Sequence, residues 1–177
     1  MIIPYTGTPG NDINLNGTVY DDHMWGYGGN DTFSSGIGHD RLYGGLGIDT
    51  LHGGPGYDML YGEENNDILQ GGLDRDFLVG GAGADKFKFR NGDSGYSTDL
   101  SKADVIADFR YKQGDKIDLS LTNVSYFGKF DGYPEPNEVS YWFRGNETVV
   151  SFNDGGQIND IVLNNFNADM IASDFIL

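Results

Sequence analysis

The chain has 177 residues, of which 27 are acidic and 11 are basic, giving a formal net charge of −16, and it contains no cysteine. A surface this acidic is a poor partner for nucleic acid, whose binding relies on Lys and Arg contacts to phosphate. The lack of cysteine excludes disulfide bonds and thiol nucleophiles. No apolar stretch approaches the roughly 20 residues of a membrane-spanning helix, so we expect no membrane partner.

The N-terminal half is a run of nine-residue repeats, in which a glycine-rich turn ends in an aspartate and an apolar residue follows two positions later. The repeat aspartates are Asp22, Asp31, Asp40, Asp49, Asp58, Asp67, Asp76 and Asp85, preceded by an imperfect copy that ends at Asp12. The apolar residues are Met24, Phe33, Leu42, Leu51, Leu60, Leu69, Leu78 and Phe87. Each apolar residue and its neighbours suffice for a short strand, and glycine permits the positive φ of a tight turn. The repeats therefore predict a flattened coil of strands and turns that becomes stable by stacking.

Two repeats complete one coil, so the turns along each edge are eighteen residues apart and their aspartates form two columns. One column holds Asp22, Asp40, Asp58 and Asp76, and the other holds Asp31, Asp49, Asp67 and Asp85. Carboxylates stacked at the roughly 4.8 Å spacing of neighbouring strands would repel one another, so a cation is expected between them. Carboxylate and carbonyl oxygens suit calcium, whereas magnesium demands stricter geometry and keeps its waters. The columns therefore predict several bound calcium ions.

The pattern G-G-x-G-x-D-x-U-x, complete in residues 44–52 and 53–61, resembles the glycine-rich RTX nonapeptide, a calcium-binding repeat. The resemblance implies an all-β fold, a parallel β-roll with calcium held between turns of adjacent coils. It also implies that backbone carbonyls near the first and third turn positions join the Asp carboxylates as ligands. Those carbonyls would belong to Gly26, Gly28, Gly44, Leu46, Gly53, Pro55, Gly71 and Leu73.

Several turns depart from the pattern. Tyr20, Asn65 and Asp74 stand where the fourth-position glycine is expected, and Glu63-Glu64 fills the second and third positions of one turn. Asn and Asp tolerate the left-handed backbone region, so the turns at Asn65 and Asp74 are expected to form. Tyr20 weakens the prediction of a site at the first complete repeat.

The nine-residue period ends near residue 90, after which glycine becomes rarer and ordinary strand-like runs appear. These runs are residues 104–109, 116–119, 139–143, 148–152 and 160–163. We therefore expect residues 1–90 to form the calcium-binding roll and residues 91–177 to form an antiparallel β cap that covers its open end.

The C-terminal half resembles two groups of RTX proteins. They are the carboxyl-terminal domain of serralysin-type metalloproteases and the R-modules of secreted alginate (mannuronan) epimerases. The resemblance rests on residues 84–89, 104–109 and 114–120, and the phrases at 93–96 and 130–133 favour the epimerase modules.

The resemblance to the protease domains implies a further calcium ion just after the roll, for which Asp93 and Asp104 are the nearest matches. The ending, residues 173–177, resembles the uncleaved signal of type I secretion substrates, and it is also compatible with a last strand of the cap. These likenesses imply a secreted, extracellular protein. The implied partners are the type I secretion machinery and an upstream catalytic or adhesive domain.

No catalytic residues are expected. The zinc motif H-E-x-x-H is absent, and the histidines at positions 23, 39 and 52 lie in outward-pointing slots of the repeats. Carboxylates committed to metal leave no acid pair for glycoside hydrolysis. The sequence therefore predicts a non-catalytic calcium-binding module that folds on extracellular calcium and supports the secretion and stability of an attached enzyme or adhesin.

One sheet of the roll is expected to display an aromatic ladder, formed by Trp25, Tyr43 and Tyr61, with Arg41 beside it. Aromatic faces can stack on sugar rings, and Arg pairs with carboxylates such as those of uronates. The alternative function is therefore an alginate- or polysaccharide-binding module. The opposing interpretation is that the ladder packs under the cap or against a partner protein, as exposed apolar patches commonly do.

Overall fold

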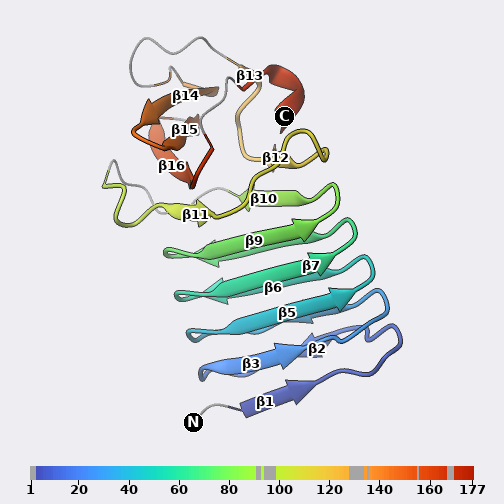
Figure 1. The fold of residues 1–177 in the computed structure, drawn as a ribbon. Coiled ribbons are helices and arrows are strands. Elements are labelled where there is room, and N and C mark those ends of the chain that lie inside the picture. The colour runs from blue at the N-terminus through green and yellow to red at the C-terminus, as the bar shows by residue number, and fades with distance from the viewer. Residues whose placement is uncertain are drawn as a thin grey trace.

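The computed structural model describes residues 3–90, 93, 99–127, 134, 136–154, 156–166 and 170–177. Strands stack along one axis from the N-terminal end to the C-terminal end, as Figure 1 shows. The first sheet contains β1 (Ile3–Thr6), β3 (Asp22–Trp25), β5 (Arg41–Leu46), β7 (Met59–Glu64), β9 (Phe77–Ala82), β11 (Asp104–Ile106), β16 (Gln157–Leu163), β15 (Glu147–Asp154), β14 (Glu138–Arg144) and β13 (Tyr126–Phe127), in that spatial order. The second contains β2 (Leu15–Asn16), β4 (Thr32–Ser34), β6 (Thr50–Pro55), β8 (Ile68–Leu73), β10 (Lys86–Arg90), β12 (Lys116–Leu121) and β17 (Phe175–Ile176).

The fold is all-β and the parallel β-roll is confirmed. Neighbouring strands of the roll pair in parallel at a spacing of two repeats, so that Leu42 lies beside Leu60 and Leu60 beside Leu78. In the described residues the one helical element is a short 3-10 turn, Ala172–Asp174, and no helix is long and apolar enough to cross a membrane.

The apolar column of the repeats forms the core between the two sheets. Its members are at most 1% exposed: Met24, Phe33, Leu42, Leu51, Leu60, Leu69, Leu78 and Phe87. Strand alternation explains this result, because every second side chain of a strand points to the same face. The same core continues without a break into the C-terminal half through residues such as Phe89, Ile106 and Phe152.

The turns between strands use left-handed backbone where the pattern places glycine. Gly54 and Gly56, at the second and fourth positions of one turn, have φ values of 116° and 135°. Asn65 and Asp74 adopt φ values of 76° and 75° at the fourth position, which confirms that these turns form. Tyr20, in contrast, is not among the residues with positive φ, so its turn departs from the others.

The parallel stack does not end at residue 90, and this corrects the expected cap. Strand β11 pairs in parallel with β9, and β12 pairs in parallel with β10, so both sheets gain a further parallel strand. Among the described residues, antiparallel pairing occurs between β14, β15 and β16, at the end of the stack far from the N-terminus (Figure 1). The reason is that residues 104–106 and 115–117 repeat the order aspartate, any residue, apolar residue, although the intervening loops have lost the nine-residue length. Residues 94–96 and 130–133, which belong to the segments that favoured the epimerase modules, lie outside the described residues.

Candidate metal sites

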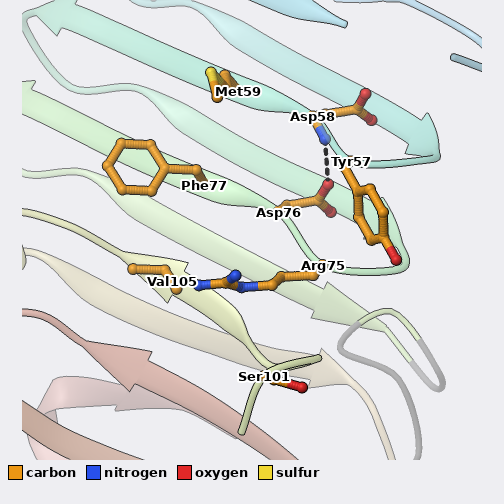
Figure 2. A pocket seen from close by; sticks show the side chains of 8 residues that line it. All are labelled: Tyr57, Asp58, Met59, Arg75, Asp76, Phe77, Ser101 and Val105. Carbon is orange, nitrogen blue, oxygen red and sulfur yellow. Dashed lines mark hydrogen bonds between the residues drawn. The ribbon is translucent and has the colours of Figure 1, made fainter. Parts of the chain in front are cut away.

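Each turn of the roll places its aspartate inside the stack. The repeat aspartates from Asp22 to Asp85 are at most 1% exposed. From Asp31 onward, each Oδ1 atom accepts a hydrogen bond from the backbone N–H of the aspartate one coil earlier; the distance from Asp58 N to Asp76 Oδ1, for example, is 2.8 Å (Figure 2). The same bond joins Asp31 to Asp49 and Asp40 to Asp58. The predicted two columns are therefore present, one along each edge of the roll.

The second carboxylate oxygen has no hydrogen-bond partner within the described residues. These free atoms are Oδ2 of Asp31, Asp40, Asp49, Asp58, Asp67, Asp76, Asp85 and Asp104. A buried carboxylate oxygen without a donor is costly, because desolvation is not offset. Repetition of the same free atom in coil after coil indicates a position for a cation.

A carbonyl oxygen of the next coil lies beside each free oxygen in the middle of the stack. A β-carbon at Gly53 would collide with both Asp58 Oδ2 and the Gly71 carbonyl oxygen, the latter at 2.6 Å. We call this arrangement a cradle: a free Asp Oδ2 and the carbonyl of the first turn residue one coil later, both facing the α-carbon of a first-position glycine. Cradles of this kind occur at Gly26, Gly44, Gly53 and Gly62.

The backbone carbonyls that the RTX resemblance predicts as ligands, at the first and third turn positions, have different surroundings. The Gly44 carbonyl belongs to the cradle of Asp31, and the Gly71 carbonyl belongs to that of Asp58. The Gly26 carbonyl lies 3.1 Å from where a β-carbon of Gly7 would stand, and the Gly53 carbonyl accepts a hydrogen bond from Ser35 Oγ.

The third-position carbonyls take part in coil-to-coil hydrogen bonding. Leu46, Pro55 and Leu73 accept backbone N–H groups of the preceding coil at 2.8, 3.1 and 3.2 Å. Gly28 forms a parallel bridge with Leu46. A carbonyl has two lone pairs, so these groups keep one site for a further contact.

In the two turns at the N-terminal end, Oδ2 of the aspartate has donors within its own turn, while Asp22 Oδ1 has no partner among the described residues. Thr18 donates both its N–H and its hydroxyl to Asp22 Oδ2, at 2.6 and 3.0 Å. Thr8 does the same for Asp12, with its N–H at 2.5 Å and its hydroxyl at 3.2 Å. These carboxylates therefore differ from the free ones in the middle of the roll.

The columns extend past the repeats. Asp104 Oδ1 accepts from Asp76 N at 2.7 Å, so Asp104 continues the first column, and its Oδ2 is free. Asp115 Oδ1 accepts from Asp85 N at 3.1 Å and continues the second column. Sequence reasoning missed Asp115, although Asp115-Lys116-Ile117 carries the same aspartate-to-apolar spacing as the repeats. Asp93 has other partners: its Oδ2 accepts from Gln70 Nε2 and from Arg90 N.

A second missed residue lies at the C-terminal edge of the second column. Asp108 accepts hydrogen bonds from the N–H groups of Gly80 and Gly81, both at 2.9 Å. In earlier turns the next coil of the roll lies at this position. Arg110 donates through its guanidinium to the Gly81 carbonyl at 2.6 Å and through its N–H to Asp115 at 2.6 Å. The side chains of Asp108 and Arg110 thus form hydrogen bonds with polar backbone groups of the last regular turn.

Burial inside the stack raises the pKa of the column carboxyls from Asp31 to Asp85, because the charged form loses its hydration. The pKa rises to about 6 for Asp49, to about 7 for Asp58 and to about 8 for Asp67. The backbone hydrogen bond to each carboxylate opposes the rise, and neighbouring carboxylates add to it. Burial also raises the pKa of Asp76 and Asp104, which lie next to each other. Without a cation, the column thus favours protonated carboxyl groups.

The donors of a cradle fit calcium. Within the described part of the chain no three histidine or acidic side chains gather into a conventional metal cluster. A cradle combines one carboxylate oxygen with backbone carbonyls, which is the hard, all-oxygen set that calcium accepts in variable geometry. The oxygens of a cradle come from turns of two adjacent coils, so a calcium ion held there would link these coils.

Comparison with known families agrees with this geometry. The family described as "RTX calcium-binding nonapeptide repeat (4 copies)" matches residues 6–42, 43–78 and 61–94, which together span half of the chain. The chain belongs to the RTX calcium-binding repeat family. Comparison with curated proteins gave no match.

Solved structures similar to this RTX roll include two from the Azotobacter vinelandii mannuronan C5-epimerase. The AlgE6R2 subunit shares 26% sequence identity with a TM-score of 0.50, and the alignment covers 98% of this chain and 91% of that chain. The AlgE6R3 subunit shares 26% identity with a TM-score of 0.42, and covers 96% of this chain and 80% of that chain. The likeness to the AlgE6R2 subunit extends over the C-terminal half as well as the repeats.

The aromatic ladder is present on the outer face of the first sheet of the RTX roll. Tyr43 stacks on Trp25 with ring centroids 5.8 Å apart and on Tyr61 at 5.0 Å, both within 5° of parallel. The side chains are partly exposed, and the C-terminal strands extend the sheet beyond β11 instead of lying over the ladder. Arg41 Nη1 lies 3.0 Å from His23 Nε2. Because neighbouring rings stack on one another, the ring faces between them are not open to a ligand.

A surface pocket of about 500 Å³ lies farther along the same outer face. Figure 2 shows its apolar side chains Met59, Phe77 and Val105, with Arg75 beside them. Arg75 donates through Nε to the Ala103 carbonyl at 3.2 Å. The repeat pattern does not predict this pocket, because its lining combines residues of two repeats with Ser101 and Val105, which follow the repeats.

Proposed function

We propose that this RTX chain is a non-catalytic module that folds when calcium enters its cradles in the extracellular medium. The observation that carries the proposal is the column of buried Asp Oδ2 atoms without a donor, each facing a carbonyl of the next coil in the middle of the stack. Calcium supplies the positive charge that this set of oxygens requires.

The chain's own groups prepare these positions. Each Oδ1 atom is held by an N–H of the preceding coil, which fixes the carboxylate and aims Oδ2 at the following coil. Glycine at the first turn position leaves room beside that oxygen. The net charge of −16 opposes compaction when no cation is bound. Binding energy at sites built from two coils therefore becomes folding energy.

An extracellular role is supported by the make-up of the sites, which take one carboxylate oxygen and backbone carbonyls from two coils and are therefore expected to bind calcium weakly. Calcium sites of extracellular modules have dissociation constants of roughly 10⁻⁴ to 10⁻³ M, well above the calcium concentration of a cytosol. The repeats would then stay unfolded inside the cell, which suits export by type I secretion machinery, and fold outside. In this proposal the module stabilises an attached catalytic or adhesive domain. The segment that resembles a secretion signal ends in β17, which pairs with β12 once folded.

Circular dichroism in excess calcium and in excess chelator, at neutral pH, tests the proposal. We expect a β spectrum with calcium and its loss with chelator, with a midpoint near 10⁻⁴ M. An unchanged β spectrum in chelator would contradict metal-coupled folding. Magnesium at the same concentration is the control, and it should be much less effective.

Binding of an anionic polysaccharide is a second candidate function. It is supported by the partly exposed ladder, by Arg41 beside it and by the likeness to a subunit of a mannuronan epimerase. Because the ring faces cover one another, contact with sugar would use ring edges, tyrosine hydroxyls and the Arg41 guanidinium. Calorimetric titration with mannuronan oligomers in saturating calcium tests this, with Tyr43→Ala as the variant. We expect weaker binding with calcium-dependent folding retained; equal binding by both proteins would remove the ladder from the site.

A further inference from the structure

One turn of the roll differs from its neighbours at the first position. Residues at that position are glycine at 7, 17, 26, 44, 53, 62, 71 and 80, but serine at 35. None of these glycines has a left-handed φ. Backbone conformation therefore does not explain the preference for glycine at this position.

Space explains it. At Gly44 a β-carbon would collide with Asp49 Oδ2 and would lie 2.8 Å from the Gly62 carbonyl oxygen. At Gly62 it would collide with Asp67 Oδ2. The missing side chain thus leaves open the volume where the carboxylate and the carbonyl of a cradle face each other. Any larger residue at the first position must enter that volume.

Ser35 enters it. The residue is fully buried, and its hydroxyl donates a hydrogen bond to the Gly53 carbonyl oxygen at 2.8 Å. Strand register aligns Ser35 with Gly53 and Gly53 with Gly71, so the Gly53 carbonyl holds the same place relative to Asp40 as the Gly71 carbonyl holds relative to Asp58. Burial raises the pKa of the Asp40 carboxyl, and the Ser35 side chain opposes that rise in part.

We infer that the Ser35 side chain fills the position where Asp40 and the Gly53 carbonyl would otherwise form a cradle, so that this turn is a metal-independent link inside a stack whose neighbouring turns take calcium. The inference rests on the proposed function, since it assigns calcium to the open cradles. The hydroxyl uses a lone pair of the Gly53 carbonyl, and the β-carbon occupies the space that a calcium ion, 2.3–2.6 Å from each oxygen, would need.

Three variants of equal charge test the inference. Ser35→Gly opens the cradle, Ser35→Ala keeps the β-carbon without the hydroxyl, and Gly53→Ser introduces the same plug one coil later. Calcium bound per chain is measured by equilibrium dialysis with elemental analysis, and the calcium midpoint of folding by circular dichroism. Because the net charge is unchanged, weak binding to the acidic surface is the same in all four proteins.

We expect Ser35→Gly to bind one calcium more per chain than the wild type and to fold at a lower calcium concentration. Ser35→Ala should bind the wild-type number, and Gly53→Ser one fewer. If Ser35→Gly binds the wild-type number, the inference is wrong. If Ser35→Ala binds one fewer, Ser35 is a ligand and not a plug. A wild type that folds without binding calcium would overturn the proposed function itself, whereas the first two results leave it intact.

Discussion

Replacing Asp58 by asparagine should have opposite effects with and without calcium. Asp58 is 1% exposed, its Oδ1 accepts from Asp40 N, and its Oδ2 faces the Gly71 carbonyl. Asparagine keeps the Oδ1 acceptor and puts an NH₂ donor beside the carbonyl. Asp58→Asn therefore removes a metal ligand while satisfying the buried atom that the carboxylate leaves free.

The size of each effect follows from the structure. Burial raises the Asp58 pKa from 3.8 to about 7, so ionising this group in the metal-free roll costs about 4 kcal/mol more than in the unfolded chain. At pH 8 the amide avoids this cost, and we expect the metal-free roll to gain roughly 2–4 kcal/mol. In calcium at about 100 times the dissociation constant, losing one ion costs about 2.7 kcal/mol.

Two titrations followed by circular dichroism measure these effects. In chelator, Asp58→Asn should hold the β spectrum to a higher pH than the wild type. In calcium at neutral pH, it should need more calcium to fold and should bind one ion fewer. Asp74→Asn is the matched control: it removes the same charge from an exposed residue whose φ of 75° asparagine tolerates. If the two variants behave alike in both titrations, the assignment of Asp58 to a cradle is wrong.

Three further predictions follow from the same geometry. In chelator, the β spectrum should be strongest at acid pH and should fade as pH rises through about 6 to 8, and a spectrum that strengthens with pH would contradict this. The reason is that the raised pKa values of Asp49, Asp58 and Asp67 contribute stability that is complete below the ordinary carboxyl pKa and is lost above the pKa of the folded state. Calcium binding in weak buffer near pH 7 should therefore release protons. Glu63→Gly should stabilise the calcium form by about 1 kcal/mol in thermal unfolding, because Glu63 has a φ of 79° that disfavours a residue with a β-carbon; no gain would show that the turn relaxes. Leu60→Ala should cost about 2–5 kcal/mol in calcium, since Leu60 is fully buried in the core; denaturant unfolding measures it, and a loss below 1 kcal/mol would mean that the core collapses around the gap.

Local sequence determined the repeating part of this protein. A strand has a side-chain period of two, and these turns need left-handed backbone. A nine-residue repeat that provides a strand with this period and a turn with glycine can therefore stack in one register. The buried apolar column, the two aspartate columns and the left-handed Asn65 and Asp74 were predictable for that reason. Each of these features depends on contacts between residues at a constant separation along the chain.

Tertiary structure decided the contacts that the repeat pattern does not specify. Asp104 and Asp115 join columns across loops that put them 28 and 30 residues from their partners, so no period reveals them. The ladder's ring planes depend on side-chain torsions, which turn their faces toward each other and away from a ligand. The role of Ser35 depends on a carbonyl 18 residues later, which only stacking brings within 2.8 Å of its hydroxyl. A repeat specifies its own conformation, whereas the occupancy of the space between coils is set by both coils together.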